Sequence, residues 1–229
     1  MMEWNQLIGD KWSKLFCILK LSPDSIVVEI GAGKQPKIGF GLARVGFRGL
    51  LFLVDPSDSR ETAYIYSKLL PHAVICPVAS LFQHSSREDL TQDRVTCVLG
   101  NHLIDDLLLT YFSQNESLPA DYYHLQNETA AKRTAQHWES VIYPNRKRLF
   151  KRLLSELIHW LTVFTPTYFI LHEYESHFYL LWSSKWPTLK TIYPTVRLFL
   201  KEFILVLRSQ LNYQRQPYLS NDWFVFMKP

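Results

Sequence analysis

The residues most suited to chemistry lie in the stretch VVEIGAGKQP, residues 27–36, where a carboxylate precedes two closely spaced glycines. Glu29 stands near the end of an apolar run, and Gly31 and Gly33 follow it. Glycine is needed where the backbone turns with positive φ or approaches a ligand closely. A second carboxylate, Asp55, ends the next apolar run, LLFLVD. This pattern predicts a cofactor-binding turn.

Two kinds of binding site use such a turn between a first strand and a first helix. Dinucleotide-binding folds use G-x-G-x-x-G to bring a helix N-terminus against a pyrophosphate. That pattern requires glycine at position 36, which here is Pro36. The other kind cradles an adenosyl group and an amino-acid carboxylate, with one acidic residue two positions before the first glycine and another at the end of the next strand. Glu29 and Asp55 fit this second kind, so a nicotinamide enzyme is disfavoured.

A second group of polar residues lies in LGNHLIDDLLL, where Asn101 ends an apolar run. His102 beside a strand end could act as a general base near neutral pH, and a hydrogen-bonded structural role is the alternative. Asp105 and Asp106 would lie in the first turn of a helix, where carboxylates interact favourably with the helix dipole. That capping role is the alternative to a substrate or cofactor role for both.

The elements that must hold these residues alternate between apolar strands and amphipathic helices. Strands are expected over residues 25–30, 49–55, 72–78, 93–101 and 167–174. Helices are expected over 3–20, 37–46, 61–71, 103–112, 129–142, 146–164 and 186–210, the last bent or restarted at Pro194. Residues 211–229 divide at SND into two strands of an antiparallel hairpin. The alternation predicts an α/β fold with a parallel sheet covered on both faces.

The run Glu29-Ile30-Gly31-Ala32-Gly33, followed by Asp55, resembles the class I S-adenosylmethionine-dependent methyltransferases. VVEIGAGKQP is similar to the first motif of that family and LVDPS to its second, and the closing hairpin fits its last two strands. The resemblance covers the architecture of nearly the whole chain. It implies a Rossmann-like, seven-stranded, mostly parallel sheet with an antiparallel last strand and helices on both faces.

The length of the chain predicts one domain over residues 1–229. Apolar spacing predicts an N-terminal helix within residues 1–22. Residues 107–150 are long for a connection between the fourth and fifth strands, and we expect a helical insertion there. Tyr111, Tyr122, Tyr123 and Trp138 make that insertion rich in aromatic residues. It is expected either to cover the acceptor pocket as a lid or to pack as an ordinary helical layer.

Cofactor contacts carry over from the family by position. Gly31, Ala32 and Gly33 would let the backbone approach the methionine moiety, and Glu29 would orient the turn or meet the ligand's ammonium group. Asp55 would accept hydrogen bonds from both ribose hydroxyls. The remaining expected cofactor residues are Ser57, Ser80 and Asn101. Many relatives hold an acidic residue where this chain has Ser80, so the adenine contact would fall to that hydroxyl or to neighbouring backbone groups.

The methyl acceptor in this fold lies beyond the fourth strand, which here leads to Asn101-His102-Leu103-Ile104. The absence of prolines there argues against the enzymes that methylate exocyclic amines of bases or glutamine amides. His102 and Asp105 are the expected catalytic residues. Asp106, His172 and Glu173 are expected to bind the acceptor, the last two because they end the fifth strand at the same edge of the sheet.

Composition limits the class of protein. Apolar residues make up 47% and charged residues 20% of the 229, as in ordinary soluble domains. No stretch reaches the roughly 20 uncharged apolar residues of a membrane span. The first residues are acidic and polar where a signal peptide needs a basic end and an apolar core, so we expect none there. We therefore expect a cytoplasmic protein with no membrane partner. The three cysteines are widely separated, and no cysteine–histidine cluster suggests a metal site.

Charge is distributed unevenly along the chain. Residues 1–131 hold 11 Lys/Arg and 15 Asp/Glu, whereas residues 132–229 hold 14 and 6. The densest basic run, RKRLFKR at 146–152, is either a solvated helix face or a site for an anionic partner such as RNA. We expect a small-molecule acceptor. The alternatives are an RNA or protein substrate, or a non-catalytic module that binds S-adenosylmethionine or S-adenosylhomocysteine and serves a partner protein.

Overall fold

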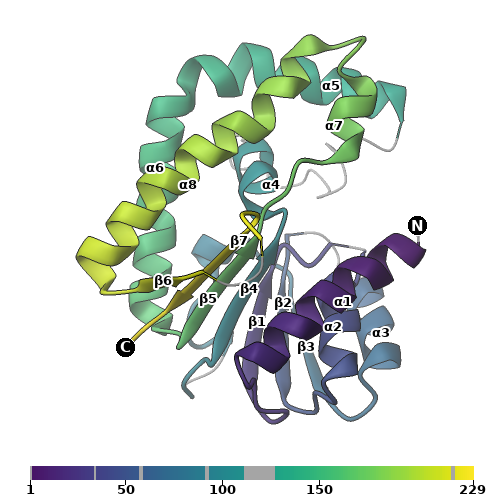
Figure 1. Ribbon diagram of the computed structural model, residues 1–229, viewed down its shortest axis with the longest axis vertical. Coiled ribbons are helices and arrows are strands. Elements are labelled where there is room, and N and C mark those ends of the chain that lie inside the picture. Colours follow the sequence, from purple (N-terminus) through teal and green to yellow (C-terminus); the bar gives the residue numbers. More distant parts are fainter. Residues whose placement is uncertain (1, 34, 57–58, 91–92, 111–126, 218–219) are drawn as a thin grey trace.

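The computed structural model describes the chain except residues 1, 34, 57–58, 91–92, 111–126 and 218–219. Its centre is a seven-stranded sheet with the order β3-β2-β1-β4-β5-β7-β6 (Figure 1). The strands are β1 (Ile26–Ile30), β2 (Leu50–Val54), β3 (Val74–Val78), β4 (Cys97–Asn101), β5 (Tyr168–His172), β6 (Gln214–Gln216) and β7 (Trp223–Met227). The strands β1 to β5 pair in parallel, and β7 runs antiparallel to both β5 and β6. The expected α/β fold with a Rossmann-like, mostly parallel sheet is confirmed.

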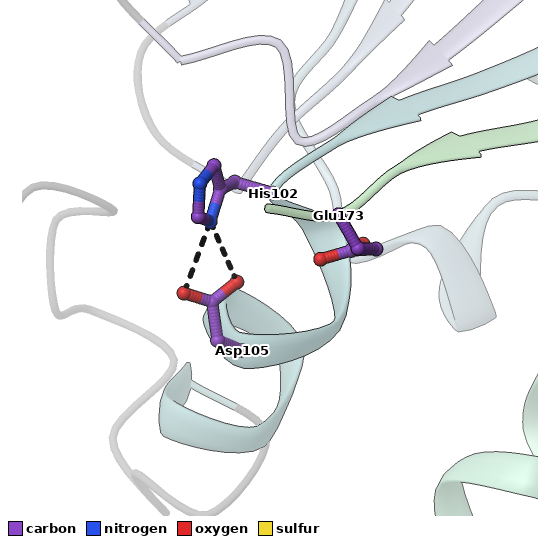
Figure 2. Close-up of side chains that lie close together, drawn as sticks. All are labelled: His102, Asp105 and Glu173. Carbon is purple, nitrogen blue, oxygen red and sulfur yellow. Dashed lines mark hydrogen bonds and ion pairs between the residues drawn. The ribbon is translucent and has the colours of Figure 1, made fainter. Parts of the chain in front are cut away.

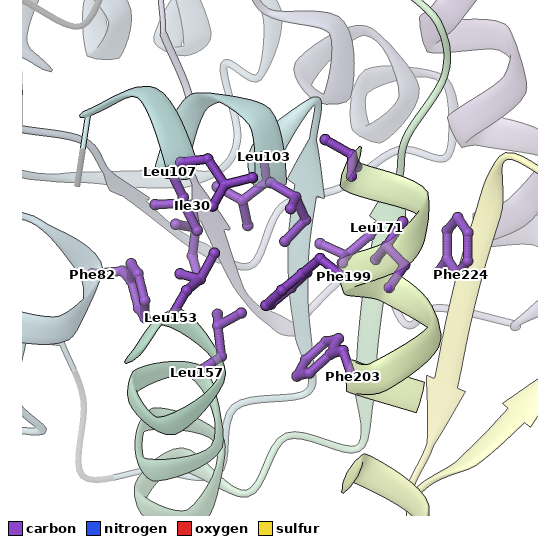
Figure 3. Packing of buried hydrophobic residues seen from close by; sticks show 14 of the residues in the cluster. Ile30, Phe82, Leu103, Leu107, Leu153, Leu157, Leu171, Phe199, Phe203 and Phe224 are labelled. Atoms are coloured by element: carbon purple, nitrogen blue, oxygen red, sulfur yellow. The ribbon is translucent and has the colours of Figure 1, made fainter. Parts of the chain in front are cut away.

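Helices cover both faces of this sheet. They are α1 (Met2–Ile18), α2 (Lys37–Arg44), α3 (Ser59–Leu69), α4 (Leu103–Thr110), α5 (Glu128–His137), α6 (Tyr143–Phe164), α7 (His177–Trp182) and α8 (Ile192–Leu211). Successive strand residues point to opposite faces. Val27 accordingly packs in one core with α1, α2 and α3, and Val28 in the other with α4, α6 and α8. Figure 3 shows this second core, where Phe199 and Phe203 of α8 face Leu157 of α6 across the sheet surface.

The helices α1 and α2 approach each other closely through two glycines. A Cβ added to Gly9 would lie 2.4 Å from the Cβ of Phe40, and one added to Gly41 would lie 2.6 Å from the Cβ of Trp12. Trp12 is fully buried at this contact. The N-terminal helix is therefore held against the first helix of the sheet, and it ends at Ile18, two residues earlier than expected.

The C-terminal half differs from the sequence prediction in three places. The two helices expected over 129–142 and 146–164 are joined without a break by a π-helical turn, η3 (Trp138–Ile142). The expected helix over 186–210 begins as a short 3-10 helix, η4 (Pro187–Thr191), and restarts at Ile192 rather than at Pro194. Pro194 then lies in the first turn of α8, where its missing N–H costs no helical hydrogen bond. The short helix α7 was not predicted.

The expected insertion is only partly described. Tyr111, Tyr122 and Tyr123 lie outside the described residues, so a lid over 107–150 stays a prediction. Trp138 is fully buried, and its Nε1–H donates to Oγ1 of Thr191 at 3.0 Å, as in a packed helical layer. Among the described helices, none is both long and apolar enough to cross a membrane.

Candidate functional site

The expected site residues gather where the order of the strands reverses. β1 lies between β2 and β4, so the chain leaves β1 on one side and returns through β4 on the other. Ligands of open α/β sheets bind at such a point, outside the carboxyl ends of the strands. The glycine turn follows β1, and His102 follows β4.

The glycine turn is held in place by hydrogen bonds to its backbone. Gly31 (φ +69) donates from N to the carbonyl of Val54 at 2.8 Å. Gly33 (φ +54) donates from N to Oδ2 of Asp55 at 3.0 Å, and its carbonyl accepts from Oγ1 of Thr62 at 2.7 Å. Among the described residues outside its own chain neighbours, the atom nearest to a Cβ added at Gly33 would be the carbonyl oxygen of Gly31, at 4.0 Å. No described side chain therefore crowds the Cα of Gly33, and Asp55, 3% exposed, anchors the turn.

Glu29 lies beneath the turn as a buried carboxyl group. Its Oε1 and Oε2 accept from the hydroxyl of Tyr66, on α3, at 2.9 and 2.8 Å. Burial raises the pKa of Glu29 to about 8, against the effect of the Tyr66 hydrogen bond, and the charge of Asp55 raises it further. Tyr66 was not predicted as a site residue. The one feature of the sequence related to Tyr66 is the glycine at position 39 of α2. A Cβ at this position would lie 2.9 Å from the Tyr66 ring.

At the end of β4, two expected catalytic residues lie side by side (Figure 2). Nδ1 of His102 is 3.3 Å from Oδ2 and 3.4 Å from Oδ1 of Asp105. The same Oδ2 accepts from the hydroxyl of Tyr179, on α7, at 2.5 Å. Burial raises the pKa of Asp105, but His102 and the hydrogen bonds from His102 and Tyr179 outweigh it and leave that pKa below its ordinary value. Tyr179 was missed because α7 itself was not predicted.

Glu173, at the end of β5, caps the N-terminus of α4. Its Oε1 accepts from the backbone N–H groups of Leu103 at 2.9 Å and Ile104 at 3.0 Å. Burial raises the pKa of Glu173 well above its ordinary value, and the charge of Asp105 adds to this. Asp105 and Asp106 lie in the first turn of α4, as expected for carboxylates that interact favourably with the helix dipole, and Glu173 adds a third carboxyl group there from the end of another strand.

One donor atom from each of His102, Asp105 and Glu173 lies within 4.8 Å of the other two. Imidazole and carboxylate are suitable zinc ligands. In this site, however, the carboxylates already accept from Tyr179 and from two backbone N–H groups. A metal ion would have to compete with these hydrogen bonds, and the expectation that the chain holds no metal stays a prediction.

His172 lies in an aromatic stack beside the site. Its ring is 1% exposed and stacks on Trp223, with centroids 4.0 Å apart and planes at 12°. Its Nδ1 lies 3.1 Å from Oδ1 of Asn101, which also accepts from Nε1 of Trp12 at 3.3 Å. Burial lowers the pKa of His172 to about 2, so the ring is neutral. An acceptor could contact His172 only if this stack opened.

One aromatic ring borders His102, and a second ring lies behind it. The ring of Tyr174 stands edge-on to that of His102, with centroids 4.1 Å apart. Trp4, in the first turn of α1, meets Tyr174 edge-on at 6.1 Å and is 39% exposed. Burial raises the pKa of Tyr174 to about 12. The start of the N-terminal helix and the end of β5 thus form an aromatic wall beside the histidine, which the sequence did not predict.

Four of the expected site residues remain to be placed. Ala32 is buried in the core, and Asp106 is exposed on α4. Ser80, half-buried after β3, donates from Oγ to the carbonyl of Leu81 at 3.0 Å. Ser57 lies outside the described residues.

Lys37, at the start of α2, is an unpredicted charged residue at this edge of the sheet. Burial lowers its pKa, and the negative charges of Asp106, Asp105 and Glu29 oppose this effect. Lys37 therefore supplies positive charge to an otherwise acidic edge.

Comparison with protein-family models gave no match, and a search of curated proteins gave none either. The chain is described by its own fold and site, as an α/β protein with a Rossmann-like sheet and a polar cluster at the switch point of that sheet.

Proposed function

We propose that this chain is an S-adenosylmethionine-dependent methyltransferase. The observation that carries the proposal is the hydrogen bond from Gly33 N–H to Asp55 at 3.0 Å. This bond joins the two stretches that resemble the first and second motifs of the methyltransferase family, at the switch point of the sheet. The antiparallel β7 agrees with the final strands of the same family. The residues fit the cofactor, because no described side chain occupies the space where a Gly33 Cβ would lie and the carboxylate of Asp55 lies directly beside this backbone.

The proposed roles follow from these positions. The cofactor, when bound, supplies a methyl group on a sulfonium. Asp55 offers its carboxylate to the ribose hydroxyls, and the backbone of residues 31–33 receives the methionine moiety. Asn101 lies next to this turn at the end of β4, and Ser57 and Ser80 complete the expected cofactor set.

A small-molecule acceptor is favoured at the site. Carboxylates and aromatic rings border His102, whereas the basic residues 146–152 lie on α6. An RNA-directed enzyme is the second candidate, because Lys147, Arg148, Lys151 and Arg152 are all exposed along that helix. We also propose a cytoplasmic location. The three cysteines are free, which suits a reducing compartment.

The first test is thermal unfolding with S-adenosylmethionine, S-adenosylhomocysteine and NAD. A ligand at about a hundred times its Kd adds about 2.7 kcal/mol to stability. For a chain of this size the melting temperature should rise by roughly 5–10 °C with both adenosyl ligands and not with NAD. Asp55→Asn should lose the shift. Asp24→Asn, which alters an exposed carboxylate paired with Arg48, should keep it.

Absence of a shift with either adenosyl ligand, in folded protein free of co-purified ligand, would remove this proposal. Binding of S-adenosylhomocysteine without methylation of any component of a cell extract would instead favour the non-catalytic binding module. A labelled product in the RNA fraction of that extract would favour the second candidate.

A further inference from the structure

The hydrogen bonds around Asp105 determine which nitrogen of His102 carries the proton. A neutral imidazole has one N–H and one bare nitrogen, and the hydrogen bond at one nitrogen fixes the state of the other. Asp105 accepts the hydroxyl hydrogen of Tyr179 at 2.5 Å, and its pKa lies below the ordinary value, so it is an ionised carboxylate with no hydrogen to donate. Nδ1 of His102, 3.3 Å from the same carboxylate, is therefore the protonated nitrogen. Nε2 is left with a free lone pair.

That second nitrogen is buried without a partner. Nε2 of His102 has no hydrogen-bond partner within the described part of the chain. A buried polar atom without a partner is costly and requires an explanation, and a catalytic role is one of those known in native proteins. The backbone of His102 is also left-handed (φ +57) and is held there by its N–H bond to the carbonyl of His172 at 3.1 Å. The local structure thus maintains this ring position at an energetic cost.

We propose that Nε2 of His102 accepts the proton of an aromatic hydroxyl group on the methyl acceptor, and that Asp105 and Tyr179 position His102 for this step. The inference rests on the proposed methyltransferase function. The hydroxyl oxygen bonds to the methyl carbon as its proton moves to Nε2, and the carbon–sulfur bond breaks with its electron pair going to sulfur. The imidazolium that forms faces the Asp105 carboxylate, which stabilises it.

The acceptor class follows from the surroundings of His102. A phenol has a pKa of about 10, within the reach of an imidazole base, whereas an aliphatic hydroxyl is far less acidic. The rings of Tyr174 and Trp4 supply an aromatic wall for such a molecule. The charged Asp105 disfavours an acceptor that carries a carboxylate or a phosphate, because like charges repel.

The first experiment measures the tautomer of His102 in the full chain by nitrogen NMR, with His102→Gln to assign the signal. In the neutral form of the ring, the wild type should carry the proton on Nδ1. Tyr179→Phe should increase the Nε2–H form. The control Tyr213→Phe, which removes a buried hydroxyl from the carbonyl of Pro166 at the other edge of the sheet, should leave it unchanged. A wild-type proton on Nε2 would overturn the inference without affecting the proposed methyl transfer.

The second experiment follows labelled methyl groups from S-adenosylmethionine into the small molecules of a cell extract. The expected product is an aryl methyl ether, which survives alkali. With the purified acceptor, Tyr179→Phe should lower kcat about 10-fold at unchanged KM, and His102→Gln should lower it by about 100-fold or more. An alkali-labile ester or a methylated amine would overturn the inference alone. Cofactor binding with no labelled product would refute the transfer reaction, and the inference with it.

Discussion

Two buried titratable side chains affect stability in opposite directions as pH changes. The pKa of Glu29 is raised by burial from its ordinary 4.5 to about 8. Its contribution is therefore complete below about pH 4.5 and is lost as pH rises through about 8. The pKa of His172 is lowered by burial from 6.5 to about 2. Its contribution is complete above about pH 6.5 and is lost as pH falls. Between about pH 4.5 and 6.5 the two groups change the free energy of unfolding in opposite directions. Above about pH 6.5, of these two groups, Glu29 alone still changes it.

Glu29→Gln should remove the part of the pH dependence that comes from Glu29. Glutamine keeps an acceptor for the Tyr66 hydroxyl but cannot ionise. Between about pH 6.5 and 8 the wild type should lose up to about 1.4 kcal/mol of unfolding free energy per pH unit from this group, and the variant should not. Urea denaturation across this range measures the difference. Glu202→Gln, at an exposed position on α8, is the control. Equal slopes for Glu29→Gln and the wild type would show that Glu29 ionises normally.

For single residues, the sequence signal that predicted the site was a position at the carboxyl end of a strand. Glu29, Asp55 and His102 could be predicted because the carboxyl ends of parallel strands meet at one edge of a sheet. Tyr66 and Tyr179 could not, because each reaches the site from a helix whose rotation depends on packing. The sequence also could not show that His172 faces a core, since the same strand end holds both Glu173, which caps α4, and the buried ring.

Among the helices, the contact of α1 with α2 depends on the absence of side chains at Gly9 and Gly41. Alanine within a helix is ordinarily favoured over glycine by about 1 kcal/mol. At Gly41 the added methyl group would overlap the Cβ of Trp12, at 2.6 Å, and atoms of Gly9 and Ser13 at 3.1–3.2 Å. Backbone atoms on both helices would have to move apart.

Gly41→Ala should therefore destabilise the protein by about 1–3 kcal/mol, the usual cost of overpacking. Chemical denaturation measures this change. Lys14→Ala, on the exposed side of α1, is the control and should change stability by less than about 0.5 kcal/mol. A stabilised Gly41→Ala protein would mean that helix propensity dominates and that α1 can shift away from α2 at little cost.

Long elements were predictable and short or irregular ones were not. The strands β1, β2 and β4 are runs of apolar residues, and α6 and α8 repeat apolar residues at helical spacing over twenty residues or more. In contrast, α7 has six residues, HFYLLW, whose apolar run carries no helical period. The π-helical turn from Trp138 also keeps helical dihedrals at both ends, so no sequence signal marks the extra residue there.

In the molecule as a whole, two hydrophobic cores share one sheet. Leu42 of α2 and Leu157 of α6 are both fully buried, on opposite faces. Each strand contributes alternate residues to the two cores, as Val27 and Val28 do in β1. Loss of either core would expose one face of every strand, so neither core should persist alone.

We therefore expect one cooperative unfolding transition, although the helices α5, α6 and α8 form a large layer of their own on one side of the sheet (Figure 1). Leu42→Ala and Leu157→Ala should each cost about 2–5 kcal/mol and lower the same melting temperature by roughly 5–15 °C. Calorimetry, with circular dichroism and tryptophan fluorescence as separate probes, tests whether the transitions coincide. Two transitions, with Leu157→Ala lowering only one of them, would mean that the helical layer unfolds independently of the sheet. Coincident transitions in both variants would mean that the switch-point site, built from residues of both faces, forms and is lost with the whole fold.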